Sequence, residues 1–331
     1  MTAFFMMKKI ALIYMGGTFG CIGDPLSPMP AEQFIPKLQH VLPLHLEIEC
    51  FTAPVIRDSS ACIASDWLQL LEQIQQLQRQ QQYHYFVIIH GTDTLSYASA
   101  VLARLTGHSA HIVLTGSQYP LFNVHSTDNR EFSDAIDNLN FALDAVVQAP
   151  AGVYLAFHHQ LLHASTALKV HTTALNAFAG TESTQALTVD LHPLIVHEQY
   201  IEKARHFNCL SLMLQPISPK LQYDNLKAIT EHPPHALIIQ GFGTGNFAVN
   251  SEIIALLQKL RQKDCAVIMT TQVPFGGIDQ RYAVSQWMVD AKILISNCHS
   301  HADLYAKALK MYLQYDTVDQ WQIHWHDESS N

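Results

Sequence analysis

The sequence predicts an α/β protein with a larger N-terminal domain, whose mostly parallel sheet is covered by helices on both faces, and a smaller C-terminal α/β domain. Three observations support this prediction. The chain has 331 residues, which is more than a single hydrophobic core usually organises. Of these residues 48% are hydrophobic, and short apolar runs alternate with helical patterns along the chain. Continuous apolar strands between helices are typical of a parallel sheet buried on both faces.

The first half of the chain provides most of the predicted elements. Four short apolar runs are predicted as buried strands: Ile10 to Met15, Phe86 to Ile89, His111 to Leu114 and Gly152 to Ala156. Apolar residues at helical spacing predict helices between them: Trp67 to Arg79, Tyr97 to Arg104 and Asp134 to Val147. Ser65 is expected to cap the first helix, with Asp66 favourable in its first turn. Met1 to Met6 are expected to be a dispensable extension.

The alternation weakens from about Leu187 to Phe207, where polar residues and Pro193 interrupt it. We therefore expect an N-terminal catalytic domain over residues 1–195, a linker over 196–209 and a smaller domain over 210–331. The smaller domain repeats the pattern, with strands expected at Leu210 to Leu214, Ala236 to Ile239 and Ala266 to Thr270, and helices at Ser251 to Arg261 and Ala302 to Leu313.

Charge and hydropathy exclude two classes of partner. With 19 Lys+Arg against 28 Asp+Glu, the formal charge of -9 repels nucleic-acid backbones and anionic lipid surfaces. No apolar run approaches the ~20 residues of a membrane-spanning helix. The sequence therefore predicts no nucleic-acid partner and no membrane partner.

The cysteines and histidines predict neither disulfides nor a metal site. The apolar run that starts at Ile10 is too short for a signal peptide, and none of the six cysteines has C-x-x-C spacing. We expect a cytoplasmic protein with free thiols. The segment Cys298 to His301 has no second cluster at zinc-site spacing, so no metal and no cofactor is expected.

Two predicted strands end in similar sequences, Gly16-Gly17-Thr18 and His90-Gly91-Thr92-Asp93-Thr94. In an open parallel sheet, ligands bind beyond the carboxyl ends of the strands, so Thr18 and Thr92 are expected to face one cleft. Glycines there allow a close approach of backbone to ligand and leave N–H groups for an oxyanion. For either segment alone, a simple turn and helix cap is the favoured interpretation, and only the two segments together favour a shared site.

These segments carry a resemblance to a known family. The specific match is His90 to Thr94, and the further matches are Gly16 to Gly20, Asp58-Ser59-Ser60, Thr115 to Gln118 and Gly241 to Asn246. Together they resemble the bacterial-type L-asparaginase and glutaminase family over most of the chain, from about Lys8 to about Leu313. Because it has Asp58-Ser59-Ser60 in place of the Asp-Ser-Gln of secreted members, the sequence looks closer to the cytoplasmic type I enzymes.

The resemblance implies an amidohydrolase that converts L-asparagine, with L-glutamine as a second candidate, to the acid and ammonia. Thr18 is implied as the nucleophile that forms an acyl-enzyme, with Thr92, Asp93 and Lys169 as the second catalytic group. The implied substrate-binding residues are Ser59, Ser60, Asp93 and Ser117. Asp58 is expected to orient its loop, and Asn246 to reach a neighbouring subunit in a homodimer or homotetramer. Without the family, Lys169 is interpreted as a solvated lysine, and Asp58-Ser59-Ser60 as either an Asx-type turn or a binding loop.

Two departures from the family pattern are visible. The family places a tyrosine shortly after the nucleophile, but Phe19 to Pro36 contains no tyrosine and Ser27 is its one hydroxyl residue. The group that activates Thr18 therefore stays open. Thr271-Gln272 is followed by Val273 where some type I enzymes have an allosteric cysteine, so allosteric control is not carried over.

Several alternatives are weighed against the hydrolase. Gly241 to Gly245 follows a predicted strand as in a nucleotide-binding loop, but Asn246 stands where a dinucleotide fingerprint needs its third glycine. A tRNA-dependent amidotransferase subunit is expected to carry an added N-terminal module. A catalytically silent amino-acid-binding protein on the same fold stays open, as do two roles for Lys169, proton acceptor or orienting cation.

Overall fold

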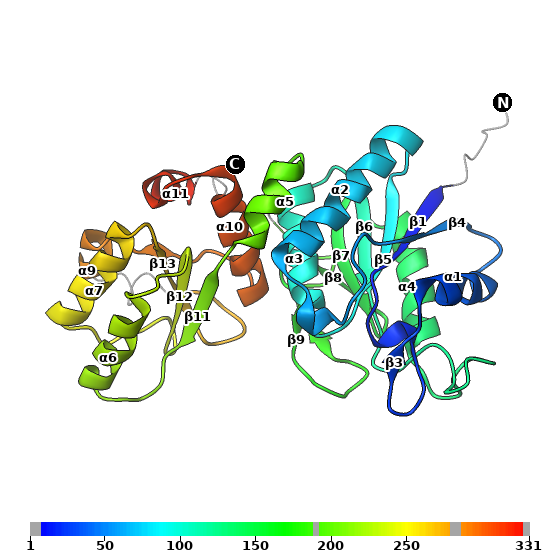
Figure 1. Ribbon diagram of the computed structural model, residues 1–331, viewed down its shortest axis with the longest axis horizontal. Coiled ribbons are helices and arrows are strands. Elements are labelled where there is room, and N and C mark those ends of the chain that lie inside the picture. The colour runs from blue at the N-terminus through cyan, green and yellow to red at the C-terminus, as the bar shows by residue number, and fades with distance from the viewer. Residues whose placement is uncertain (1–7, 188–191, 279–285, 327–331) are drawn as a thin grey trace. The chain divides into compact units, whose positions relative to one another are not determined.

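The computed structural model describes residues 8–187, 192–278 and 286–326. The chain divides into two compact units, Met1–Arg205 and His206–Asn331, called unit 1 and unit 2 here (Figure 1). The segment 196–209, expected as a linker, contains helix α5 (Glu198–Arg205), which packs on helix α2 (Ala64–Gln81) of unit 1. The expected extension Met1 to Met6 lies outside the described residues.

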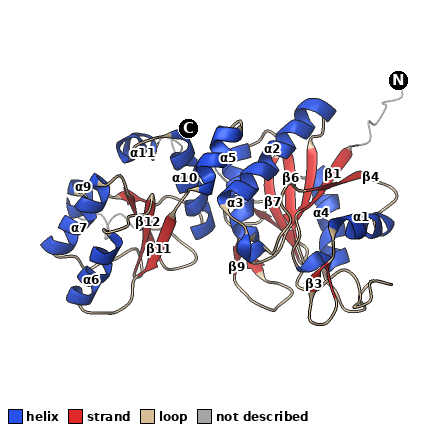
Figure 2. Cartoon of the chain, viewed as in Figure 1, coloured by secondary structure: helices blue, strands red, loops and turns tan. Residues whose placement is uncertain are grey.

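Unit 1 contains a six-stranded sheet in the order β4-β1-β5-β6-β7-β8 (Figure 2). The neighbouring pairs from β4 to β7 are parallel, and β8 returns antiparallel beside β7. This confirms the mostly parallel sheet. The strands are β1 (Lys9–Tyr14), β4 (Glu47–Thr52), β5 (Tyr85–Ile89), β6 (His111–Thr115), β7 (Gly152–Phe157) and β8 (Gln160–His163).

Helices cover both faces of this sheet. On one face Ile10 and Leu12 of β1 lie in one core with Phe34 of α1 (Ala31–His40) and Leu139 of α4 (Ala135–Gln148). On the other face, α3 (Leu95–Thr106) contacts β6 and β7, and α2 packs on α3. Because both faces are buried, the strands read as continuous apolar runs in the sequence.

The expected cap at Ser65 is wrong. Helix α2 already begins at Ala64, so Ser65 lies inside the first turn, where it is buried. The carboxylate of Asp66 accepts the backbone N–H of Ile63 at 3.0 Å instead. An acidic side chain at the third helical position can reach back in this way to the N–H of the residue that precedes the helix.

Unit 2 is the smaller α/β unit, as predicted. Its parallel sheet has the order β11 (Cys209–Met213), β12 (Ala236–Gly241), β13 (Ala266–Thr271), β14 (Leu294–Ile295). One core is formed with α6 (Pro219–Ile229), α7 (Ser251–Gln262) and α9 (Gln286–Asp290). A second core on the same sheet involves α10 (His301–Gln314) and α11 (Val318–His324).

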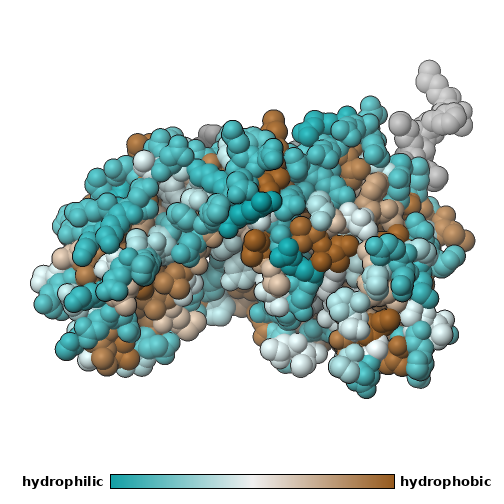
Figure 3. All heavy atoms as spheres, viewed as in Figure 1, coloured by the Kyte–Doolittle hydropathy of each residue, from teal (hydrophilic) through white to brown (hydrophobic). Residues whose placement is uncertain are grey.

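The surface seen in Figure 3 is mostly hydrophilic, with small apolar patches between polar residues. Within the described ranges, no helix is both long and apolar enough to cross a membrane. The six cysteines are free thiols. No group of metal-ligating side chains occurs among the residues that the structure describes.

Candidate active site

The loops that follow β1 and β5 meet at two glycines. A Cβ atom on Gly17 would lie 2.6 Å from the amide nitrogen of Gly91, so only glycine fits there, and its φ of 88° also favours glycine. Thr18 and Thr92 are the next residues of the two loops. The structure therefore brings together the two strand ends that the sequence predicted to share a cleft.

Thr18 begins a short 3-10 turn, η1 (Thr18–Gly20), directly beyond β1. The residue is half-buried, and its hydroxyl has no hydrogen-bond partner in the described part of the chain. Its carbonyl accepts the N–H of Cys21, and the Gly20 N–H donates to the Gly17 carbonyl at 3.2 Å. The backbone of the turn is thus fixed by hydrogen bonds, whereas the Thr18 side chain makes none with the described residues.

The segment after this turn is a small hairpin of β2 (Cys21–Ile22) and β3 (Ser27–Pro28). Ser27 is exposed, and its hydroxyl donates to the Ile22 carbonyl at 3.4 Å, within the hairpin itself. A tyrosine outside this hairpin contacts the turn that begins at Thr18. The Tyr14 hydroxyl lies against Gly20, where a Cβ atom would overlap with it, and burial raises the pKa of this tyrosine.

The Asp58-Ser59-Ser60 loop leads into the turn η2 (Ser59–Ala61). The Ser60 hydroxyl and N–H donate to one Asp58 carboxylate oxygen at 2.7 and 2.8 Å, and these hydrogen bonds lower the pKa of Asp58. Ser60 is exposed, whereas Ser59 is buried. The Ser59 hydroxyl accepts the Asp93 N–H at 3.3 Å, so Ser59 also fixes the second threonine loop.

The second group expected to be catalytic is assembled around Lys169, at the end of the short strand β9 (Leu168–Lys169). Its Nζ donates to the Thr92 hydroxyl oxygen at 2.9 Å and pairs with the Asp93 carboxylate at 3.2 Å. The Lys169 side chain is 20% exposed and that of Asp93 57%. Lys169 is therefore not an ordinary solvated lysine, and the Asp93 carboxylate keeps a face open to a ligand.

Two further predicted residues are placed differently from the catalytic group. Ser117 is buried, and its hydroxyl donates to the Tyr119 carbonyl at 2.6 Å, so its hydrogen is already used within its own loop. Asn246 belongs to unit 2, where it is exposed and bridges to Phe242. The expectation that Ser117 lines the cleft stays a prediction.

The sequence analysis gave no role to His90, whose buried side chain holds the start of the second threonine loop, after β5. The Trp67 indole N–H donates to His90 Nε2 at 3.2 Å, so Nδ1 carries the proton, which it shares with the Gly91 carbonyl at 2.8 Å. Burial lowers the pKa of His90 to about 4. A neutral imidazole thus holds the residue that precedes Thr92, and only the His-Gly-Thr-Asp-Thr sequence itself hinted at it.

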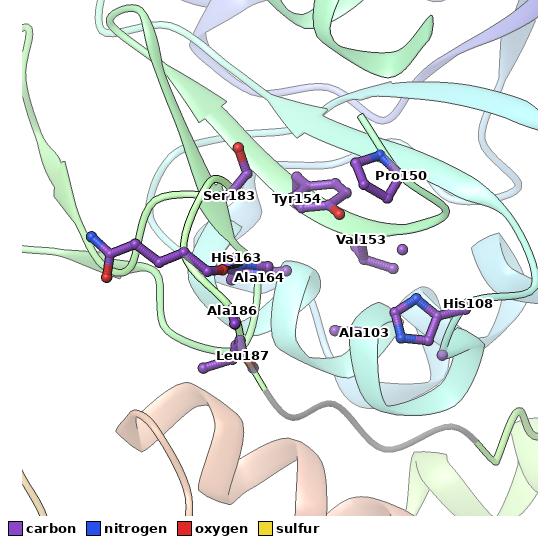
Figure 4. A pocket seen from close by; sticks show the side chains of 14 residues that line it. Ala103, His108, Pro150, Val153, Tyr154, His163, Ala164, Ser183, Ala186 and Leu187 are labelled. Carbon is purple, nitrogen blue, oxygen red and sulfur yellow. Dashed lines mark hydrogen bonds between the residues drawn. The ribbon is translucent and has the colours of Figure 1, made fainter. Parts of the chain in front are cut away.

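A cavity of about 200 Å³ lies in another part of unit 1 (Figure 4). Its walls include His108, Tyr154 and His163. None of the residues predicted as catalytic or substrate-binding lines it. The candidate active site is therefore defined by the contacts among the strand-end loops rather than by this cavity.

Comparison with known proteins identifies the family. Residues 9–201 match the family model described as Asparaginase, N-terminal, and residues 214–322 match the Glutaminase/Asparaginase C-terminal domain. The chain belongs to the asparaginase family. The resemblance seen in the sequence motifs is thereby confirmed over both units. Family membership supports the interpretation of the site as that of a hydrolase.

Individual asparaginases show how distant the likeness is. L-asparaginase 1 of Escherichia coli (strain K12) is 27% identical over 305 residues, which cover 87% of this chain and 86% of that protein. The L-asparaginase of Dirofilaria immitis is 27% identical over 284 residues, 80% of this chain but only 45% of that longer protein. The thermostable L-asparaginase from Thermococcus kodakarensis has the same fold, with a TM-score of 0.76 at 21% identity over 98% of this chain and 97% of that one.

Proposed function

We propose that this asparaginase-family protein hydrolyses L-asparagine to L-aspartate and ammonia, with L-glutamine as a second candidate substrate. The observation that carries the proposal is the contact of Lys169 Nζ with both Thr92 and Asp93, together with the close approach of Gly17 and Gly91, the residues that precede Thr18 and Thr92. The proposed reaction uses no metal and no cofactor, because a hydroxyl nucleophile and a proton-transfer partner suffice for amide hydrolysis.

The first half of the proposed reaction is acyl transfer. The Thr18 hydroxyl oxygen attacks the side-chain carbonyl carbon of asparagine, and the hydroxyl proton is passed to the amide nitrogen. When the tetrahedral intermediate collapses, the C–N bond breaks, the nitrogen leaves with that proton as ammonia, and a β-aspartyl ester remains on Thr18. The free state of the Thr18 hydroxyl supports this role, because a hydroxyl without a competing partner is available for attack.

The second half is hydrolysis of that ester by water. The Thr92 hydroxyl, 2.9 Å from Lys169 Nζ, is the proposed group that exchanges a proton with the attacking water. A positioned proton-transfer group contributes about 10²–10⁴ in rate, enough to make deacylation depend on it. Thr92 is buried, which supports a fixed position for the hydroxyl.

Substrate recognition is assigned to charges and hydroxyls at the rim. The exposed carboxylate of Asp93 is the proposed partner of the substrate's α-ammonium group, and Ser59 and Ser60 are the proposed donors to its α-carboxylate. Ser60 suits this role better, since it is exposed whereas the Ser59 oxygen already accepts the Asp93 N–H. Ser117 is left as a buried support of the neighbouring loop.

We further propose a cytoplasmic enzyme that assembles as a homodimer or homotetramer, in which Asn246 reaches the site of a neighbouring copy. The exposure of Asn246 on unit 2 is compatible with such a contact. Light scattering during turnover tests this proposal. An active monomer would contradict any site that is shared between subunits.

The reaction is tested by measuring ammonia and aspartate release from L-asparagine, with L-glutamine measured in parallel. Equal amounts of ammonia and aspartate are expected. In Thr92→Val, slowed deacylation should leave a β-aspartyl adduct on Thr18, visible by intact mass and peptide mapping. Binding of asparagine by calorimetry without release of ammonia would contradict the hydrolase and support the silent amino-acid-binding alternative.

A further inference from the structure

Lys169 is followed directly by a loop that returns to its paired strand. Residues 170–177 connect β9 to β10 (Phe178–Ala179), and the Val170 N–H closes the loop by donating to the Ala177 carbonyl at 2.8 Å. Within the loop, His171 Nδ1 accepts the N–H groups of Thr173 and Ala174 at 3.1 and 2.9 Å. These bonds give the loop its shape, but they do not tie it to the threonine loops.

Gln118 supplies such a tie from a different part of the chain. Its side-chain Nε2 donates to the Thr172 carbonyl at 3.3 Å and to the Ala174 carbonyl at 2.9 Å. A primary amide has two N–H donors, so one side chain can satisfy both carbonyls at once. The loop beyond Lys169 is thereby fastened to the segment that follows β6.

Gln118 is itself rigidly held. Its backbone N–H donates to the Asp134 carboxylate at 3.0 and 3.1 Å, and the same carboxylate accepts the N–H of Tyr119 at 3.0 Å. Asn138, one turn further along α4, donates to Asp134 and to the Gly116 carbonyl, each at 3.0 Å. Hydrogen bonds to a carboxylate are stronger than neutral ones, and both Asp134 and Asn138 are buried. The support of Gln118 therefore comes from the body of unit 1.

We propose that Gln118 is a positioning residue that holds Lys169 Nζ on the Thr92 hydroxyl. This inference rests on the proposed hydrolase function and adds to it a residue with no assigned part in the reaction. A lysine side chain has many rotamers, so the placement of its Nζ depends on a fixed backbone. Misplacement of a reacting group by about 1 Å can cost about 100-fold in rate. Gln118 acts only through Lys169 and touches neither the substrate nor the nucleophile.

The kinetic test replaces Gln118 by methionine, which keeps the length of the side chain and removes its donors. We expect kcat for L-asparagine to fall about 10- to 100-fold while KM stays within about twofold, because substrate contacts are untouched. The matched control is Gln78→Met on α2, whose side-chain amide likewise donates to a backbone carbonyl, that of Ser109, at 2.9 Å. The control should keep the wild-type kcat. A larger rise in KM than fall in kcat for Gln118→Met would overturn the proposal.

A double-mutant comparison tests whether Gln118 works through Lys169. In a Lys169→Met background, Gln118→Met should change the residual rate by less than about twofold, because the group that it positions is gone. If the two rate losses multiply instead, Gln118 acts by another route and the positioning role is rejected.

Amide hydrogen exchange tests whether Gln118 holds the loop after Lys169, independently of any activity. In Gln118→Met, the N–H groups of Val170, Thr173 and Ala174 should exchange at least about tenfold faster, while those in β6 stay as in the wild type. Unchanged exchange in the loop would overturn the proposal even if kcat falls. A wild-type protein that releases no ammonia but shows the faster loop exchange in Gln118→Met would contradict the proposed function and leave the tie standing.

Discussion

The two threonine loops start alike and are held very differently. After β1, the Thr18 hydroxyl is half-buried and has no hydrogen-bond partner in the described part of the chain. After β5, Thr92 is buried, accepts from Lys169 and lies between anchors at His90 and Ser59. A nucleophile must be free to approach a substrate, whereas a proton-transfer group must keep a fixed partner. These different contacts support the two different roles that we propose for the same Gly-Thr sequence.

Removing the Thr18 hydroxyl should have the largest effect on activity. In Thr18→Ala, ammonia release from asparagine should fall at least about 10⁴-fold, because no other group is placed to form the ester. The variant loses no core volume, so its circular dichroism and thermal midpoint should match the wild type. Near-wild-type activity in Thr18→Ala would reject the nucleophile assignment.

Changing Lys169 should have the next largest effect and should distinguish its two roles. Lys169→Met is expected to lower kcat about 10²–10⁴-fold by removing the partner of Thr92. Lys169→Arg keeps a cation that is not deprotonated in proteins. Since the ion pair with Asp93 is part of the geometry, we expect the cation to be the working form and Arg to retain more activity than Met.

An arginine variant as inactive as Lys169→Met would favour the proton acceptor over the orienting cation. Near-wild-type rates in both variants would reject both roles. The comparison is made by steady-state kinetics on L-asparagine under identical conditions.

The buried His90 side chain should make the stability of the folded protein depend on pH. Burial lowers the pKa of His90 from 6.5 to about 4, so below pH 6.5 the unfolded chain binds a proton that the folded chain does not. The resulting loss of stability begins as the pH falls below 6.5 and is complete below about pH 4. Between about pH 7.5 and about pH 5 it amounts to about 2 kcal/mol.

The test is urea unfolding at these two pH values, for the wild type and for His90→Gln, which keeps a donor and an acceptor but does not titrate. All other ionisable groups are the same in both proteins, so the difference between them isolates His90. An equal pH dependence in the two proteins would contradict the neutral, buried imidazole.

The smallest effect is expected at the rim of the site. Ser60→Ala should raise KM for asparagine about 3- to 10-fold with little change in kcat, because one hydrogen bond to a charged group is lost. Ser27→Ala is the matched control, since the Ser27 hydroxyl donates within its own hairpin. A kcat loss in Ser27→Ala as large as that expected for Thr18→Ala would instead identify Ser27 as the group that activates the nucleophile.

The elements that the sequence predicted well are those with strong local patterns. The strands β1, β5, β6 and β7 are buried on both faces, so each appears as an uninterrupted apolar run. The edge strand β4 has only partial cover, and its Glu47-Ile48-Glu49 start does not read as a core strand. The Ser65 cap was wrong because the helix begins one residue earlier, at Ala64, where the Asp66 carboxylate reaches back to the Ile63 N–H.

By itself, the sequence determined the α/β class, the two-part organisation and the resemblance of Gly16 to Gly20 and His90 to Thr94 to one family, because periodicity and turn chemistry are local properties. Tertiary structure alone decided which distant residues come into contact. Gly17 packs against Gly91, Lys169 donates to Thr92, and Gln118 donates to the loop after Lys169. These partners lie far apart in the chain, so their contact depends on how the strands are ordered and where the loops pack. The same packing decided the different states of Thr18, Thr92 and Ser117, since a hydroxyl is free or committed according to the neighbours that folding brings to it.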